Sequence, residues 1–140
     1  MKGVKIIELP TISDHRGRVT VAELTRVLPF EVERIFWIYE VPENKIRASH
    51  AHRLQQQVLF PLGGSFRVKL DDGTSSDSFI MDEPSKGLLI PAGVWISISN
   101  FSSGAICLVL SPAPYDETEY IHDYHEFLEW KRIADESGLD

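Results

Sequence analysis

Two histidines in the stretch RASHAHRLQQQ, residues 47–57, are the side chains best suited to carry chemistry in this sequence. Side chains two positions apart on an extended strand point to the same face, so His50 and His52 should face one way and Ala51 the other. An ordinary imidazole titrates near about pH 6.5 and can take up and return a proton at neutral pH. The pair is compatible with a metal site, an acid/base pair or two structural histidines on a rim.

The segments around these histidines have the pattern of an antiparallel β-structure. Up to residue 112, short runs rich in Val, Ile and Phe alternate with turn residues at 63–64, 71–73 and 91–93. Strands at intervals of roughly 8 to 12 residues, with no helical spacers, predict a sandwich or a barrel. The expected strands are VKIIEL, RVTVAEL, VERIFWIY, QQVLFPL, SFRVKL, SDSFIM, GLLIP, VWISIS and AICLVL.

The hydrophobic period changes after residue 112. Asp116, with Glu119 three positions later, has the pattern of a capping box at the start of a helix. The apolar residues that follow at helical spacing are Ile121, Tyr124, Phe127 and Leu128. Gly138 lies where such a helix should end. We therefore expect a helix over 116–137 that covers an open end of the barrel, takes part in dimerisation or closes a site.

Length and charge restrict the class of protein. A chain of 140 residues is the usual size of one domain. Its net charge of -7 argues against binding nucleic acid or anionic lipid, although a local arginine cluster can still bind an anionic substrate. Cys107 is the single cysteine and is expected to be a buried, inert thiol. No run approaches the ~20 apolar residues of a membrane span, and MKGVKIIELP is too short for a secretory signal, which predicts a cytoplasmic protein.

Two stretches are similar in outline to the metal-binding motif of the cupins, which are small jelly-roll β-barrels. That motif joins His-x-His and a following Glu to Pro-x-Gly-x-x-His. His50 and His52 match the first part and PAGVWI, residues 91–96, the second, but Gln57 replaces the glutamate and Ile96 the last histidine. An amide binds a divalent ion far less well than a carboxylate, and isoleucine cannot bind one. We therefore expect no metal.

Five stretches resemble one branch of the cupins, the sugar 3,4-ketoisomerases of the WxcM-like type. They are DHRGRV at 14–19, RASHAHRLQQQVL at 47–59, LDDG at 70–73, GLLIPAGVW at 87–95 and SPAPYDETEYIHDYHEFL at 111–128. The last is similar to the family's ending YDExDYIRDYxEF, which no general constraint of a barrel requires. The resemblance implies an all-β jelly-roll barrel over about 1–112 with a short C-terminal helix, in one domain, 1–140. It also implies a homodimer, in some members with an exchanged N-terminal strand.

The resemblance further implies an isomerase that needs no cofactor. Such an enzyme moves the ketone of a TDP-4-keto-6-deoxyhexose from C4 to C3 through an enediolate, in the synthesis of 3-amino sugars for a surface polysaccharide. His50 would be the base that carries the proton between C3 and C4. His52 would donate hydrogen bonds to the two oxygens and relay their protons. The two roles could also be exchanged.

Other residues enter the predicted substrate site by the same resemblance. A regular strand puts Arg47 on the face opposite His50, so only a bend or bulge would bring it to the site, and a rim arginine is the alternative. Gln57 would hold a sugar hydroxyl or orient a histidine, or else be a core amide. Arg16 suits a diphosphate or keto oxygen through its planar fork of donors. Tyr39 is a third acid/base candidate. Trp95 would stack on the base or fill the barrel.

One departure from the family leaves the function open. Ile96 stands where members often have histidine or arginine, a position tied to the face on which C4 is reprotonated. Three other functions are therefore kept beside the ketoisomerase. They are a related TDP-sugar epimerase, a non-catalytic sugar-binding or regulatory cupin, and, disfavoured by Gln57 and Ile96, a metal-dependent oxygenase.

Overall fold

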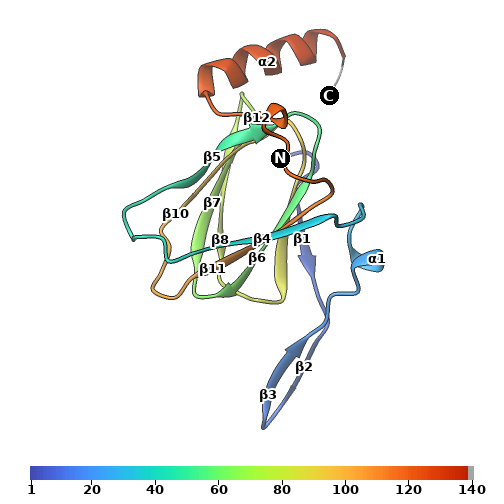
Figure 1. The fold of residues 1–140 in the computed structure, drawn as a ribbon, viewed down its shortest axis with the longest axis vertical. Coiled ribbons are helices and arrows are strands. Elements are labelled where there is room, and N and C mark those ends of the chain that lie inside the picture. Colours follow the sequence, from blue (N-terminus) through green and yellow to red (C-terminus); the bar gives the residue numbers. More distant parts are fainter. Residues whose placement is uncertain (139–140) are drawn as a thin grey trace.

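Two antiparallel sheets of five strands each form the body of the protein (Figure 1). The computed structural model describes residues 1–138. The first sheet has the order β1 (Lys5–Glu8), β9 (Lys86–Ile90), β6 (Gln57–Gly63), β11 (Ile106–Ser111) and β4 (Arg34–Tyr39). The second has the order β12 (Tyr120–Ile121), β5 (Arg47–His52), β10 (Trp95–Ser99), β7 (Phe66–Asp71) and β8 (Ser76–Met81). The predicted all-β, jelly-roll architecture is confirmed.

The core lies between the two sheets and follows the alternation of the strands. On β7, Phe66, Val68 and Leu70 are buried, whereas the residues between them are exposed. Ile96 and Ile98 of β10 point to the same side and join the same core cluster. Each such side chain contributes roughly 1.5–3 kcal/mol on burial. The core therefore fixes which face of β5 and β10 is turned inward.

Cys107 lies inside this core. It is a free cysteine and is fully buried, and burial raises the pKa of its thiol to about 12. A thiol that stays protonated is a poor nucleophile. The expectation of an inert, buried cysteine is confirmed.

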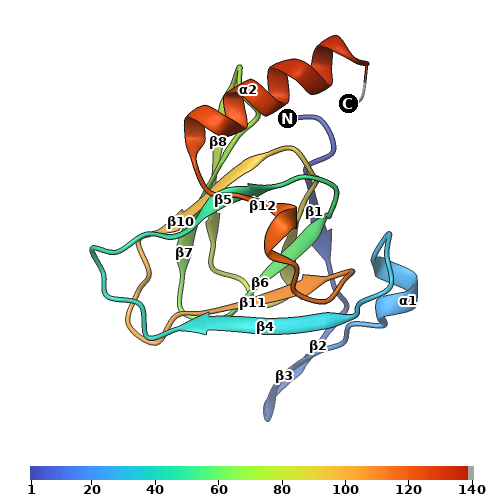
Figure 2. The same ribbon diagram turned by 45° about the horizontal axis from the view of Figure 1, so that its top comes forward.

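The C-terminal segment differs from the predicted helix over 116–137. Asp116 caps only a short 3-10 turn, η1 (Glu117–Glu119), and the chain then forms β12. Helix α2 (Tyr124–Glu136) begins later, where the Asp123 side chain accepts a hydrogen bond from the backbone N–H of Glu126. Figure 2 shows α2 crossing one end of the barrel above β5 and β12. The segment is thus a strand of the second sheet as well as a covering helix.

Helix α2 is held to the outer face of the second sheet by an aromatic cluster. Phe127 is fully buried and packs with Ala51 and Ile121, with Trp95 at the border of the cluster. The Trp95 ring lies 5.8 Å from Phe127 and 5.4 Å from Tyr124, between ring centroids. Trp95 therefore lies beneath the helix and not inside the barrel. The alternative that it fills the barrel is wrong, and stacking on a base stays a prediction.

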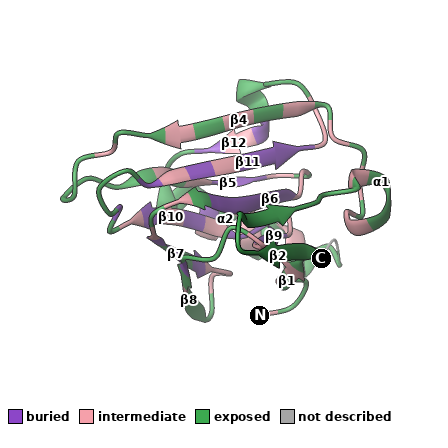
Figure 3. Cartoon of the chain, turned by 90° about the horizontal axis from the view of Figure 1, so that it is seen from below, coloured by how far each residue is buried: buried purple, intermediate pink, exposed green. Residues whose placement is uncertain are grey.

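A hairpin projects away from the barrel near the N-terminus. It consists of β2 (Thr11–Asp14) and β3 (Gly17–Thr20), and all of its strand residues are exposed, as Figure 3 shows. The expected strand RVTVAEL ends at Thr20, and Leu24–Val27 form the one-turn helix α1 instead. Neither α1 nor α2 is long and apolar enough to cross a membrane, and no other α-helix occurs within residues 1–138.

Candidate functional site

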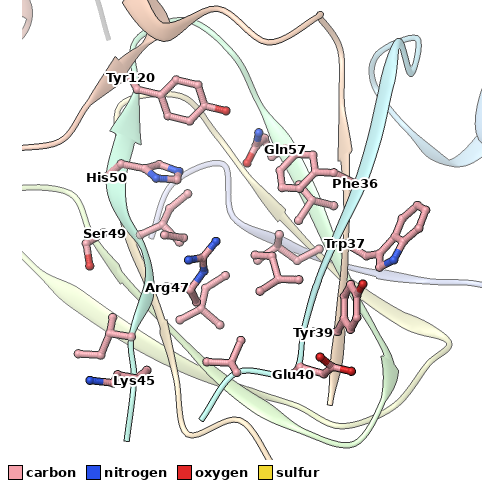
Figure 4. Close-up of a pocket in the computed structure, with 18 of the residues that line it drawn as sticks. Phe36, Trp37, Tyr39, Glu40, Lys45, Arg47, Ser49, His50, Gln57 and Tyr120 are labelled. Carbon is pink, nitrogen blue, oxygen red and sulfur yellow. The ribbon is translucent and has the colours of Figure 1, made fainter. Parts of the chain in front are cut away.

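A cavity of about 790 Å³ opens between β4 of the first sheet and β5 of the second (Figure 4). Its inner wall is apolar and includes Leu59, Ile96 and Val109. Its polar side chains come from β4, from the loop between β4 and β5, from β5, from Gln57 at the start of β6 and from the segment that follows η1. The two sheets and the C-terminal segment thus build the site together.

A β-bulge on β5 turns Arg47 toward this cavity. Ile96 pairs with His50 and Ile98 with Arg47, so two residues of β5 stand opposite one residue of β10. Ala48, within the bulge, has a φ of 59°, in the left-handed region that non-glycine residues rarely adopt. Arg47 and His50 therefore both line the cavity (Figure 4), and the bulged alternative of the sequence analysis is confirmed.

The two histidines of β5 are neighbours in different environments. Their ring centroids lie 5.1 Å apart with the rings nearly perpendicular. His50 is half-buried and lines the cavity. His52 is only 2% exposed and does not line it, and neither of its ring nitrogens has a hydrogen-bond partner among the described residues. The geometry therefore favours His50 as the ring that can contact a bound molecule.

Both imidazoles are held neutral. Burial is the main cause that lowers the pKa of His50 to about 3, followed by the electrostatic effects of His52 and His122. Burial also lowers the pKa of His52 to about 4, with a further contribution from the nearby Arg34 guanidinium. Low polarity disfavours the charged form of an imidazole. At neutral pH both rings are thus available as proton acceptors.

These lowered pKa values predict that acid destabilises the protein through the histidine pair. In the unfolded chain both imidazoles take up protons below about pH 6.5, while the native state does not, so the free energy of unfolding falls as the pH drops. Urea unfolding between about pH 6.5 and pH 5 measures the slope. The His52→Gln variant has only one of the two imidazoles that take up a proton on unfolding. Its free energy of unfolding should therefore change less steeply with pH than that of the wild type. Equal slopes in the two proteins would contradict the prediction.

The sequence analysis missed a tyrosine that covers the histidine pair. Tyr120 pairs with His52 in the register of β12 and β5, and its ring centroid lies 4.9 Å from that of His50 and 4.6 Å from that of His52. Its hydroxyl accepts a hydrogen bond from Nη2 of Arg34 at 3.1 Å. The same Nη2 lies 3.4 Å from Oγ of Ser111. Arg34 thereby fixes the position of Tyr120.

A second missed pair lies next to this tyrosine. The His122 ring stacks on Tyr120 with an angle of 4° between the ring planes. Its Nε2 lies 2.8 Å from Oε1 of Glu117, at hydrogen-bond distance. His122 lines the cavity, whereas Glu117 lies behind it. The family-specific ending could have revealed Glu117, which this chain shares with it, but that ending has arginine at the position of His122.

The donor atoms do not fit a metal centre. The Gln57 side chain is buried and lines the cavity but offers only an amide. Ile96 is 3% exposed, opposite His50, and offers no donor at all. Within residues 1–138 no group of three His, Cys, Asp or Glu side chains is placed to hold a metal ion. A pair of imidazoles alone falls short of the usual ligand set.

Two of the remaining predicted site residues lie apart from His50. Tyr39 borders the cavity at the end of β4, but Figure 4 shows its ring on the outer side of the strand, away from His50. Arg16 sits on the projecting hairpin, where its Nη2 lies 2.7 Å from Oδ2 of Asp14. That ion pair raises the pKa of Arg16 and lowers that of Asp14. Arg16 does not line the cavity of its own chain.

Comparison with known proteins agrees with the fold. The family described as WxcM-like, C-terminal matches residues 2–132. A protein of Aneurinibacillus thermoaerophilus named TDP-4-oxo-6-deoxy-alpha-D-glucose-3,4-oxoisomerase is 37% identical over 123 residues, 88% of each chain. The structure of a 3,4-ketoisomerase from Helicobacter canadensis, 38% identical, superimposes with a TM-score of 0.90 over 94% of this chain and 99% of that one.

A further structure contains a ligand. It is a mutant of the 3,4-ketoisomerase QdtA from Thermoanaerobacterium thermosaccharolyticum in complex with TDP-4-keto-6-deoxyglucose. It is 30% identical to this chain and superimposes with a TM-score of 0.92 over 95% of this chain and 96% of that one. With similarity along almost its whole length, the chain belongs to the WxcM-like, C-terminal family.

Proposed function

We propose that this isomerase moves the ketone of a TDP-4-keto-6-deoxyhexose from C4 to C3. The observation that carries the proposal is the neutral His50 imidazole facing the cavity, in a chain 37% identical to a protein named as a 3,4-oxoisomerase. A ligand-bound relative, QdtA, supports the nucleotide-sugar class of substrate. An aminating enzyme can convert a ketone at C3 into an amine. The proposed reaction would therefore precede the synthesis of a 3-amino sugar.

The chemistry follows from the acidity of a hydrogen next to a carbonyl. His50 takes the proton from C3, and the electron pair forms a C3–C4 double bond while charge develops on the C4 oxygen. The C3 hydroxyl loses its proton and the C4 oxygen gains one, and the same imidazolium then returns the first proton to C4 as the C3 ketone forms. A base placed in this way contributes about 10²–10⁴-fold in rate. Because hydrogen moves as a proton within one substrate, no redox cofactor takes part.

The other residues of the cavity have supporting roles in this proposal. His52 lies against the edge of His50 and holds it in place, which is a positioning role. Gln57 holds a sugar hydroxyl at the inner wall. Arg47 and Lys45, of which Lys45 lies farther from His50 in Figure 4, provide positive charge for the diphosphate.

One experiment tests this function against its alternatives. The protein is incubated with TDP-4-keto-6-deoxyglucose in deuterated buffer, with and without a chelator, and C3 and C4 are followed by NMR. We expect the keto signal to move to C3, with or without chelator. Deuterium incorporation without ketone transfer would indicate an epimerase-like enzyme. An unchanged substrate would indicate a binding or regulatory cupin, and loss of turnover with chelator a metal enzyme.

We also propose that two copies of the chain form a homodimer. Ile35, Trp37 and Tyr39 alternate along the edge strand β4 on the face away from the core, and each is about half exposed. All strand residues of the hairpin β2–β3 are exposed, and an isolated two-stranded hairpin is marginally stable in water. An exchange of this N-terminal hairpin between the copies would bring Arg16 close to a substrate of the neighbouring subunit.

Replacing Trp37 by glutamate is expected to convert the dimer into single chains. Trp37 is 58% exposed on the edge strand, so a buried dimer contact would be lost while the monomer fold stays intact. Sedimentation equilibrium measures the mass. Ile80→Glu is the matched control, because Ile80 is 57% exposed on β8, at the edge of the other sheet, and should leave the mass unchanged. A wild-type protein with the mass of one chain would refute the dimer.

A further inference from the structure

His122 brings a second imidazole to the end of the cavity where His50 lies. Its ring centroid is 6.1 Å from that of His50, and the two rings stand at 81° to each other. Both rings line the cavity, one from β5 and the other from the residue directly after β12. Two groups at this separation can address the reacting carbon and the reacting oxygens of one bound hexose.

Glu117 orients the His122 ring. A carboxylate only accepts hydrogen bonds, so Nε2 of His122 carries the hydrogen in its 2.8 Å contact with Oε1, and Nδ1 is left to exchange a proton. The other oxygen of Glu117 accepts a hydrogen bond from the Tyr115 hydroxyl. The parallel Tyr120 ring fixes the plane of the imidazole from one side. A general acid or base held by a carboxylate in this way is a recurring catalytic arrangement.

The other groups of the cavity are less suited to move the protons of sugar oxygens. Arg47 and Lys45 have donors but no acceptor. The Tyr120 hydroxyl already accepts a hydrogen bond from Arg34. His52 is 2% exposed and does not line the cavity, so it is less accessible to a bound sugar than His122 is.

We propose that His122, oriented by Glu117, carries the protons of the two reacting oxygens. The proposal rests on the ketoisomerase function and assigns a residue to one part of it. As His50 removes the C3 proton, the imidazolium of His122 donates a proton to the C4 oxygen, and a neutral enediol results. His122 then takes the proton of the C3 hydroxyl as that oxygen becomes the ketone and His50 returns its proton to C4. Both imidazoles end in their starting states.

Binding of the diphosphate is a poorer role for His122. The Glu117 carboxylate in contact with its ring would repel an anion. The cationic side chains Arg47 and Lys45 also line the cavity, and Figure 4 shows Arg47 between His50 and the more distant Lys45. These two donors suit a diphosphate better than the His122 ring does.

The test compares four variants in the deuterium NMR assay. His122→Gln keeps a polar side chain but cannot transfer protons, and we expect ketone transfer to fall about 10²-fold or more with little change in KM. Glu117→Gln should give a smaller loss and a shifted pH profile of kcat. His122→Arg restores positive charge without proton transfer and should stay slow. His125→Gln, an exposed histidine of α2 outside the cavity, is the matched control and should keep wild-type rates.

The outcomes separate this proposal from the function on which it rests. In His122→Gln, exchange of the C3 hydrogen should slow less than ketone transfer, because His50 is intact. Rates equal to those of His125→Gln, or full rescue by His122→Arg, would overturn the proton-transfer role. If the wild type exchanges hydrogen without moving the ketone, the ketoisomerase is refuted, while exchange that is slower in His122→Gln than in His125→Gln still supports proton transfer by His122. A wild type that does neither refutes both proposals.

Discussion

Replacing His50 by glutamine should lower kcat for ketone transfer by about 10²–10⁴-fold and leave the binding of the TDP-sugar little changed. The amide fills a similar volume and can still hydrogen-bond, but it cannot accept a proton from carbon. His50 is the histidine of β5 that lines the cavity, and its lowered pKa keeps it neutral at the pH of the assay. The measurement is kcat and KM at neutral pH, with exchange of the C3 hydrogen followed in parallel.

Two controls separate loss of the base from loss of structure. His125→Gln makes the same chemical change at an exposed position of α2 and should leave kcat unchanged. Isothermal titration with TDP should give similar affinities for wild type and His50→Gln. A His50→Gln variant that retains most of its turnover would show that another group removes the C3 proton, and the mechanism proposed for the cavity would be wrong.

The alternation of apolar residues predicted the strands. It did not determine on which face of its strand each site residue lies. The arginine at position 47 is three residues before His50, and a regular strand would turn it outward. The chain avoids this with a bulge in which Ala48 adopts a φ of 59°. That conformation favours glycine or asparagine, so an alanine gives no local signal of it. Only the register with β10 reveals the bulge.

The C-terminal segment was misassigned because two capping patterns occur within ten residues. Asp116 and Glu119 match a capping box, and Asp123 and Glu126 match it again. The second is the true helix start, because β12 takes up the residues between them and pairs with β5. This pairing joins segments far apart in the sequence, and local spacing cannot indicate it. The error hid Tyr120 and its neighbour His122 from the predicted site.

The position of Trp95, in contrast, could have been read from the strand itself. Ile96 and Ile98 are both in the core, so a residue one position before them points to the opposite face. The sequence analysis weighed only the roles of an inward ring. Arg16 is a different case, because no residue of its hairpin lines the cavity of its own chain. A role for Arg16 depends on how two chains assemble.

Replacing Phe127 by alanine is expected to lower the free energy of unfolding by about 3–5 kcal/mol. Phe127 is 0% exposed and packs against Ile121 and Trp95, so the truncation leaves a cavity between α2 and the second sheet. Domains are stable by only roughly 5–15 kcal/mol, so this loss is a large share of the total. Urea unfolding with an unchanged m value measures it.

The same substitution should also reduce activity, because α2 holds β12 and the residues that follow it. β12 has two residues, one of which, Ile121, packs on Phe127, while the other, Tyr120, covers His50. Ile133→Ala is the matched control on the same helix: Ile133 is 51% exposed, and we expect a change within about 0.5 kcal/mol and full turnover. If Phe127→Ala unfolds like the control, α2 is not what holds β12. If it loses stability but keeps wild-type kcat, β5 alone positions the site.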